Sequence, residues 1–131
     1  MVDFIRWANT SKTAIYIEAP EVIAEQDIPN IITRINQLVK STDSQLDLII
    51  DRSKTTNVPR KMLIVMGKVI SKNNYRQIVL IGFAMLPKML VETLTRLAGV
   101  FQSDPIFVDT LAEAYDKLGI TDPVSQDTYQ A

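Results

Sequence analysis

The sequence predicts a single α/β domain, built on a mixed and mostly parallel sheet of about five strands with helices on both faces. Two short and nearly continuous apolar runs, 46–51 and 76–82, are typical of strands that are covered on both sides. Helical patterns alternate with these runs, and such alternation indicates parallel strands joined by crossover helices. The chain has 131 residues, 47% of them hydrophobic, which is enough to fill the core of one domain.

The chain begins with a predicted β-hairpin. Residues 3–8 and 13–19 have strand character, and the polar turn formers Asn9-Thr10-Ser11-Lys12 separate them. Pro20 then ends the second strand. Because a tight turn joins them, the first strand must run antiparallel to the second.

An amphipathic helix follows the hairpin. Its apolar residues recur at the spacing of a single helix face: Ile28, Ile31, Ile32, Ile35, Leu38 and Val39. We expect Asp27 to cap the first turn, where Pro29 is tolerated because that N–H has no helical partner. The polar residues 41–44 end the helix.

Two more helices are predicted on either side of the strand at 76–82, over about 58–72 and 86–101. A last short strand is expected at 106–108. The predicted order is therefore ββαβαβαβα.

The last predicted helix has clear signals at both ends. Thr110 and Glu113 have the spacing of a capping box, and Gly119 stands where a helix-ending glycine belongs. Its inward face is expected to carry Leu111, Ala114, Tyr115 and Leu118. The residues that follow are polar and unpatterned, so we expect a domain over 1–119 and a frayed polar tail over 120–131.

Composition restricts the chemistry. The chain has no His and no Cys, which removes the commonest general acid/base, thiol nucleophiles and cysteine metal sites. Asp51 and Asp109 both end predicted strands, but such residues more often cap the following turn than act as a pair. We therefore expect a non-enzymatic protein with no catalytic residue, no metal and no cofactor.

Charge and hydropathy restrict the partners and the location. The net charge of −1 argues against bulk nucleic-acid binding. No uncharged apolar run reaches 18 residues, so no membrane span is expected, and no signal peptide is visible. These features favour a cytoplasmic protein.

Three stretches carry a resemblance to a known family. The element order, the strand 46–51 ending in Asp51, the strand 76–82 ending in Gly82, and the stretch 107–114 together resemble the STAS-type fold. That fold belongs to bacterial anti-anti-sigma factors (SpoIIAA-like proteins) and to STAS/SEC14-like relatives. The resemblance covers about residues 3–118 and implies a regulatory module that binds another protein.

The family also implies a phosphorylatable hydroxyl after the third strand, within an Asp-Ser-(Ser/Thr)-Gly tract. The equivalent stretch here, 51–58, has hydroxyls at Ser53, Thr55 and Thr56 but lacks that tract. The resemblance therefore supports the interaction module more strongly than the phosphorylation switch.

The loop after the third strand is the first candidate site. Ligands of open α/β sheets bind beyond the carboxyl ends of the strands, and helix N-termini favour anions. This loop is basic and leads into a predicted helix, so it suits a phosphate or an acidic partner, unless it is only a solvated loop. Its candidate residues are Arg52, Ser53, Lys54, Thr55, Thr56, Asn57, Arg60 and Lys61.

Two apolar stretches are further candidates. The uncharged segment 82–87 offers an apolar rim of Phe83, Met85 and Leu86, unless it is only a buried turn. Five consecutive apolar residues at 62–66 need cover from neighbouring helices or from another subunit. The self-association candidates there are Met62, Val65 and Met66.

Together these features predict an interaction module with a protein partner of unknown identity, with homodimerisation as an open alternative for the apolar helix. The second hypothesis is binding of a small amphiphilic or anionic ligand between the apolar rim (82–87) and the basic loop (52–61).

Overall fold

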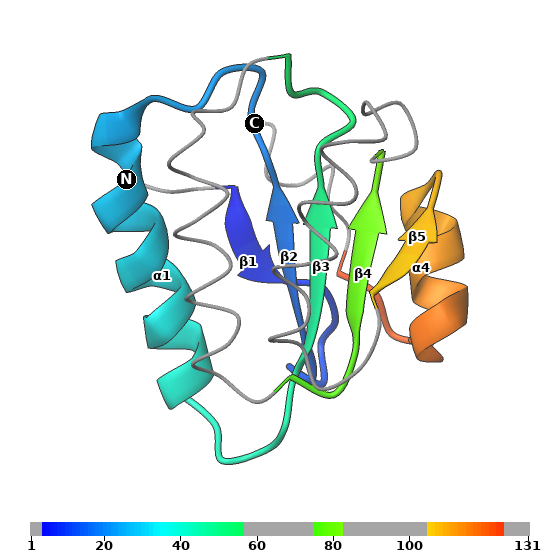
Figure 1. Cartoon of the computed structure of the whole chain (residues 1–131). Helices are drawn as coiled ribbons and strands as arrows, with labels where there is room; N and C mark the ends of the chain where they lie inside the picture. Colours follow the sequence, from blue (N-terminus) through cyan, green and yellow to red (C-terminus); the bar gives the residue numbers. More distant parts are fainter. Residues whose placement is uncertain (1–3, 57–74, 83–104, 125–131) are drawn as a thin grey trace.

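One five-stranded sheet organises the part of the chain that the structure, a computed structural model, describes: residues 4–56, 75–82 and 105–124 (Figure 1). The strands are β1 (Ile5–Trp7), β2 (Ala14–Glu18), β3 (Asp47–Asp51), β4 (Ile78–Ile81) and β5 (Ile106–Val108). The helices are α1 (Ile28–Lys40), α4 (Leu111–Leu118) and the short 3-10 turn η1 (Glu25–Asp27). The predicted α/β class and mixed five-stranded sheet are confirmed. The helices predicted at about 58–72 and 86–101 lie outside the described residues.

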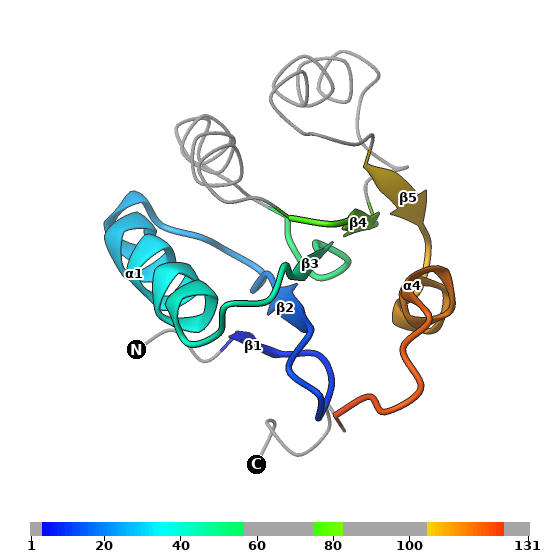
Figure 2. The same cartoon turned by 90° about the horizontal axis from the view of Figure 1, so that it is seen from below.

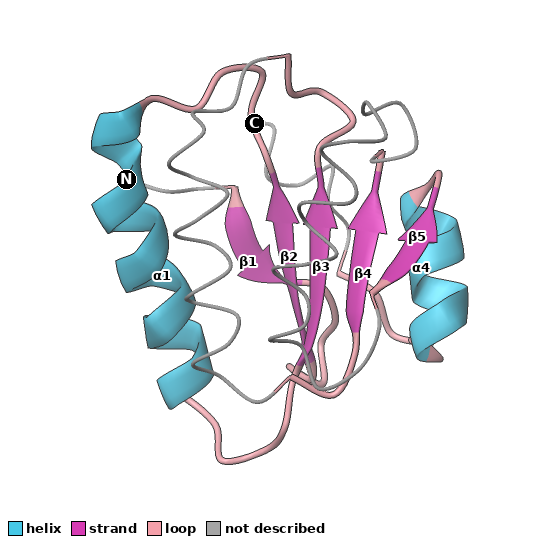
Figure 3. Cartoon of the chain, viewed as in Figure 1, coloured by secondary structure: helices cyan, strands magenta, loops and turns pink. Residues whose placement is uncertain are grey.

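The strands lie in the sheet in the same order as in the chain (Figure 3). β1 pairs with β2 antiparallel, with Arg6 opposite Tyr16, as the predicted hairpin requires. From β2 to β5 each strand pairs parallel to the next. The carboxyl ends of four strands therefore meet at one edge of the sheet. Because the order of the described strands never reverses, they contain no topological switch point, where α/β sheets usually open a ligand crevice.

The strand side chains alternate between two cores, one on each face of the sheet. α1 lies on one face and α4 on the other (Figure 2). Ile15 and Leu48 face α1, whereas Tyr16 and Ile49 face the side that carries α4. This alternation confirms that β3 is covered on both faces, as its continuous apolar run predicts. One described helix lies on each face, which confirms the predicted layering for α1 and α4.

α1 buries the face that its periodicity predicts. Its inward residues are Ile28, Ile31, Ile35 and Leu38, and Ile32 and Val39 pack half-buried beside them. The predicted role of Asp27 is wrong, because its side chain makes no capping bond to α1. Its Oδ2 instead accepts the N–H of Ala24 at 3.1 Å and closes the η1 turn. The backbone of Asp27 is already helical and not extended, so the chain enters α1 through the additional 3-10 turn η1.

α4 has the termini that the sequence predicts. Thr110 Oγ1 accepts the N–H of Glu113 at 3.2 Å, and Gly119 ends the helix in the left-handed conformation with φ of 68°. Glu113 reaches back to the N–H of Asp109 at 3.5 Å, one residue before the cap. Ala114 and Leu118 are buried, with Leu111 and Tyr115 half-buried against the same core.

The described start of the predicted tail is not frayed. Residues 120–124 lie against the β1–β2 hairpin, where Asn9 and Pro123 form an isolated antiparallel bridge. Polarity alone misassigned this segment, because its hydrogen-bond partners lie more than 100 residues earlier in the chain. Neither of the described helices is long and apolar enough to cross a membrane.

An ion pair between a buried carboxylate and a half-exposed guanidinium lies at the amino end of β3. Asp47 is 2% exposed and accepts two hydrogen bonds from Arg76, at 2.9 Å from Nε and 2.6 Å from Nη2. The paired carboxylate raises the pKa of Arg76, so this guanidinium stays charged. The pair links the start of β3 to the segment that leads into β4.

Truncation of α1 in its core tests the helix-to-sheet packing. Ile35 has no exposed surface, so Ile35→Ala should lower the free energy of unfolding by about 2–5 kcal/mol through lost burial and the remaining cavity. Urea denaturation measures the change. The exposed Gln37→Ala on the same helix is the control, expected within about 0.5 kcal/mol of the parent. Equal effects of the two changes would contradict this packing.

Candidate partner-binding surface

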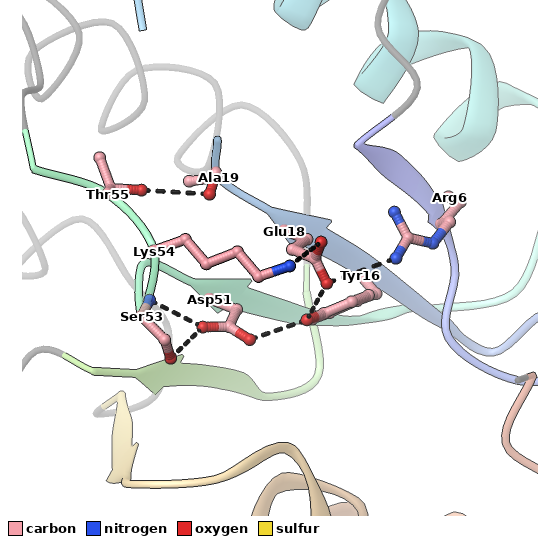
Figure 4. A network of polar contacts seen from close by, with 8 residues as sticks. All are labelled: Arg6, Tyr16, Glu18, Ala19, Asp51, Ser53, Lys54 and Thr55. Carbon is pink, nitrogen blue, oxygen red and sulfur yellow. Dashed lines mark hydrogen bonds and ion pairs between the residues drawn. The ribbon is translucent and has the colours of Figure 1, made fainter. Parts of the chain in front are cut away.

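The candidate surface lies at the carboxyl ends of β2, β3 and β4, where loop 52–56 leaves the sheet (Figure 4). Glu18 ends β2, Asp51 ends β3 and Gly82 follows β4. The parallel pairing sets Glu18 directly beside Asp51 in register. Two acidic side chains are therefore held next to each other on the α4 face of the sheet.

Tyr16 joins these two carboxylates. Its ring is 1% exposed, and its hydroxyl oxygen lies 2.7 Å from Asp51 Oδ2 and 3.1 Å from Glu18 Oε2. Burial, together with the hydrogen bond and negative charge of Asp51, raises the pKa of Tyr16 far above its ordinary value. The phenol therefore stays neutral and donates its single proton, with the shorter distance favouring Asp51.

Cationic side chains balance the carboxylates. Arg6 Nη2 lies 3.6 Å from Glu18 Oε2, and its guanidinium carbon lies 5.1 Å from the centre of the Tyr16 ring. Lys54 Nζ lies 3.1 Å from Glu18 Oε1. Arg6 is 6% exposed, so Glu18 has a buried charge of opposite sign on one side and a solvent-exposed lysine on the other.

Asp51 shapes the turn that follows β3. Its Oδ1 accepts both the backbone N–H and the hydroxyl of Ser53, at 2.9 Å and 2.5 Å. This arrangement is an Asx turn, in which a side chain replaces a backbone acceptor. The turn-capping role that the sequence favoured for Asp51 is confirmed.

Two of the predicted candidates point into the loop itself. Arg52 donates to the carbonyl oxygens of Gly82 at 3.4 Å and Thr55 at 3.2 Å. The Thr55 side chain is 6% exposed and donates to the carbonyl oxygen of Ala19 at 3.2 Å. Arg52 and Thr55 therefore hold loop 52–56 against the ends of β2 and β4.

The remaining described candidates face solvent. Ser53 and Thr56 are exposed, and the Lys54 side chain is 59% exposed. Thr56 donates through its N–H and its hydroxyl to the carbonyl oxygen of Glu21, at 2.9 Å and 3.2 Å. Loop 52–56 is thereby joined to the loop that follows β2.

Val22 is a surface residue that the sequence reasoning missed. It is 56% exposed and follows the residue to which Thr56 bonds. Its signal in the sequence is weak: an apolar residue after Pro20, before the α1 periodicity begins. We call the exposed set Val22, Ser53, Lys54 and Thr56 the upper surface.

Gly82 brings the end of β4 against loop 52–56. Its φ of 79° lies in the left-handed region, and an added Cβ would lie 3.1 Å from Ser53 N and 3.2 Å from its Cα. Glycine is therefore required both for the backbone conformation and for the close approach. Gly82, the first residue of the predicted apolar segment 82–87, therefore lies beside loop 52–56.

The other predicted site residues lie outside the described residues: Asn57, Arg60, Lys61, Met62, Val65, Met66, Phe83, Met85 and Leu86. Asp109 is described and exposed, and none of the described hydrogen bonds joins it to Asp51. Within the described ranges, no three acidic side chains gather closely enough to hold a metal ion.

Comparisons with protein-family models, with curated proteins and with solved structures find no significant match to this chain.

Replacing Gly82 tests the close contact between β4 and loop 52–56. Gly82→Ala should lower the free energy of unfolding by about 2–3 kcal/mol, from left-handed strain plus the contact with Ser53. Gly119→Ala is a matched control, because it has φ of 68° but nothing within 4 Å of its added Cβ. The control should cost only about 1 kcal/mol. Equal losses in urea denaturation would contradict the contact.

Removing the Tyr16 hydroxyl tests the link between the strand ends. Tyr16→Phe should destabilise the fold by about 1.5–3 kcal/mol, because Asp51 loses a buried donor. In the parent, the pKa of Tyr16 in the folded state lies above its value of about 10 in the unfolded state. The stability gained from the neutral phenol is therefore complete below about pH 10 and is lost as the pH rises further, by up to about 1.4 kcal/mol per pH unit.

The variant lacks this contribution, so the stability difference between the parent and Tyr16→Phe should shrink from about pH 10 upward. Urea denaturation of both proteins between about pH 9 and about pH 11 measures it. A stability difference that does not change over this range would contradict a buried Tyr16 hydroxyl between the carboxylates of Glu18 and Asp51.

Proposed function

We propose that the chain is a non-enzymatic module that binds a protein partner through the upper surface. The observation that carries this proposal is that some side chains of loop 52–56 hold the loop in place while others face solvent. Arg52 and Thr55 point inward and hold the loop, whereas Ser53, Lys54 and Thr56 point outward. A loop fixed in this way presents its outer side chains with little entropy left to lose on binding.

The chemistry of the upper surface suits a protein partner. Val22 gives an exposed apolar contact, and Thr56 bonds to Glu21, the residue before it. Ser53 and Lys54 add an exposed hydroxyl and an exposed ammonium group from the same loop as Thr56. Protein interfaces combine an apolar centre with a polar rim in this manner. Lys54 adds a cation whose local partner, Glu18, is shared with Arg6, so an acidic group on the partner can compete for it.

We further propose that the module is of the STAS type. A hairpin that leads into consecutive parallel strands, with α1 on one face and a capped α4 on the other, supports this relation. The family's role in regulation by protein contact is consistent with a surface at the loop after β3.

A phosphorylation switch at Ser53 has a physical basis in this loop. The Ser53 hydroxyl donates to Asp51, so a phosphoryl group would replace a donor with about two negative charges beside a carboxylate. Repulsion would open the Asx turn and change the upper surface. Thr55 is less suited, because its hydroxyl is buried against Ala19.

A second candidate function is binding of a small amphiphilic or anionic ligand between loop 52–56 and the segment that starts at Gly82. The close approach of Gly82 to Ser53 favours it, because the two halves of that site meet there. The contacts of Arg52 and Lys54 weaken it, because both side chains already bind oxygen atoms of the chain.

Substitutions on the upper surface test the proposed function. The full chain and its variants Val22→Asp and Lys54→Glu serve as bait for proteins of the native cell, quantified by mass spectrometry. The affinity of each variant for a specifically retained partner should fall by about 5- to 30-fold, since each change disrupts a contact worth about 1–2 kcal/mol. Lys40→Glu changes the same charge at the exposed end of α1 and should retain it.

Equal retention of every partner by the parent and both variants would contradict the upper surface as the binding site. Incubation with kinases of the native cell addresses the switch separately. Phosphate on Ser53 would support it, and a complete absence of phosphate from Ser53, Thr55 and Thr56 would remove the switch while leaving the module.

A further inference from the structure

Residues 122–124 contact the β1–β2 hairpin at the amino end of β2, which is opposite to the end that carries the upper surface. They lie beside residues 8–10 in antiparallel orientation. The Thr10 N–H donates to the Asp122 carbonyl at 3.0 Å, and the Val124 N–H donates to the Ala8 carbonyl at 2.8 Å. Asn9 and Pro123 form the bridge between these two bonds. The chain thereby covers part of the edge of its own hairpin.

The side chain of Asp122 is held by a convergent set of donors. Its Oδ2 accepts the hydroxyl of Thr10 at 2.8 Å, the N–H of Ser11 at 2.8 Å and, at very short range, the hydroxyl of Ser11. The bonds from Ser11 and then Thr10 lower the pKa of Asp122 to about 2, so the carboxylate is charged at neutral pH. All three donors come from a turn whose next residue, Lys12, has a φ of 56°.

The turn is held in shape by a separate set of bonds. Asn9 Oδ1 accepts the N–H groups of Thr13 and Ala14 at 3.0 Å and 3.2 Å, and Asn9 Nδ2 donates to the Thr13 hydroxyl at 2.6 Å. None of these bonds involves Asp122. The backbone of the turn that carries Thr10 and Ser11 is therefore held by bonds within the hairpin, and these bonds do not require the carboxylate of Asp122.

We propose that the hairpin edge formed by Ala8, Thr10 and Ser11 is a docking site for an extended peptide segment that carries an aspartate, and that residues 122–124 fill it within the same chain. Strand addition supplies the backbone bonds of such a site, and the donors on Thr10 and Ser11 supply the specificity. The site is distinct from the upper surface and does not depend on the proposed function.

The geometry favours a peptide over a free anion. A free carboxylate can accept from Thr10 and Ser11, but it has no N–H to donate to the Ala8 carbonyl. The seated segment makes both kinds of contact at once. It therefore defines the occupant: an extended backbone with a carboxylate on the residue that pairs with Thr10.

Release of the chain's own segment is the first arm of the test. Hydrogen exchange of the full chain is measured by NMR for the parent, for Asp122→Ala and for the control Asp116→Ala, which removes an exposed carboxylate from α4. The amides of Thr10 and Val124 should exchange at least about tenfold faster in Asp122→Ala than in either other protein, corresponding to about 1.4 kcal/mol. Unchanged exchange would overturn the proposal.

Refilling the empty site is the second arm. The blocked peptide Gly-Ile-Thr-Asp-Pro-Val-Ser, which has the sequence of residues 119–125, is added at millimolar concentration to Asp122→Ala. It should shift the amide signals of Thr10 and Ser11 and restore protection at Thr10. The parent should respond at least about tenfold more weakly, because its tethered segment competes at a high effective concentration.

Matched probes distinguish the possible occupants. The same peptide with Asn in place of Asp, and acetate alone, should each fail to protect Thr10. Protection by either one would overturn the requirement for an aspartate-bearing peptide. A dimer of the parent that dissociates in Asp122→Ala, measured by light scattering, would overturn it as well, because the segment would then come from a second copy.

Discussion

The partly buried hydrogen bond between Tyr16 and Asp51 is the interaction on which the carboxyl end of the sheet depends. It joins Tyr16 of β2 to Asp51, the last residue of β3. It thereby lets these two neighbouring strands end in carboxylates on the same face of the sheet. Without a neutral donor between them, Glu18 and Asp51 would repel each other in a poorly solvated position. Arg6 completes the balance from β1, over the tyrosine ring.

The loop architecture follows from this constraint. Because Tyr16 occupies one oxygen of Asp51, the other oxygen is left to form the Asx turn with Ser53. That turn directs Ser53 toward Gly82, where only the absence of a side chain permits the approach. The carboxylate of Asp51 thus connects the buried core of the sheet to the exposed upper surface.

The strand order explains why the candidate surfaces are loops and edges. The described strands advance in one direction from β1 to β5, so no crevice opens between oppositely directed crossovers. Surface is available instead at the loops beyond β2 and β3 and at the hairpin on the opposite end. Both places are shaped by short-range side-chain caps, Asp51 in one and Asn9 in the other. Such caps set backbone geometry while leaving neighbouring hydroxyls and amides for a partner.

The sequence alone determined the elements whose signals are local. The apolar spacing of α1, the capping residues of α4 and the continuous apolar run of β3 each depend on neighbours within a few residues, so their physics can be read directly from the chain. The carboxyl edge and the turn-capping role of Asp51 were also within reach, because parallel strands and Asx turns follow simple rules.

Tertiary structure alone decided which side chains of those elements are available. Arg52 and Thr55 turn inward because carbonyl groups of β2 and β4 lie beside them, and Val22 turns outward because Thr56 holds its loop from 35 positions away. Asp27 serves a preceding turn, and Asp122 returns to the hairpin from the far end of the chain. These outcomes depend on partners that are distant in sequence, and periodicity and composition carry no information about such partners.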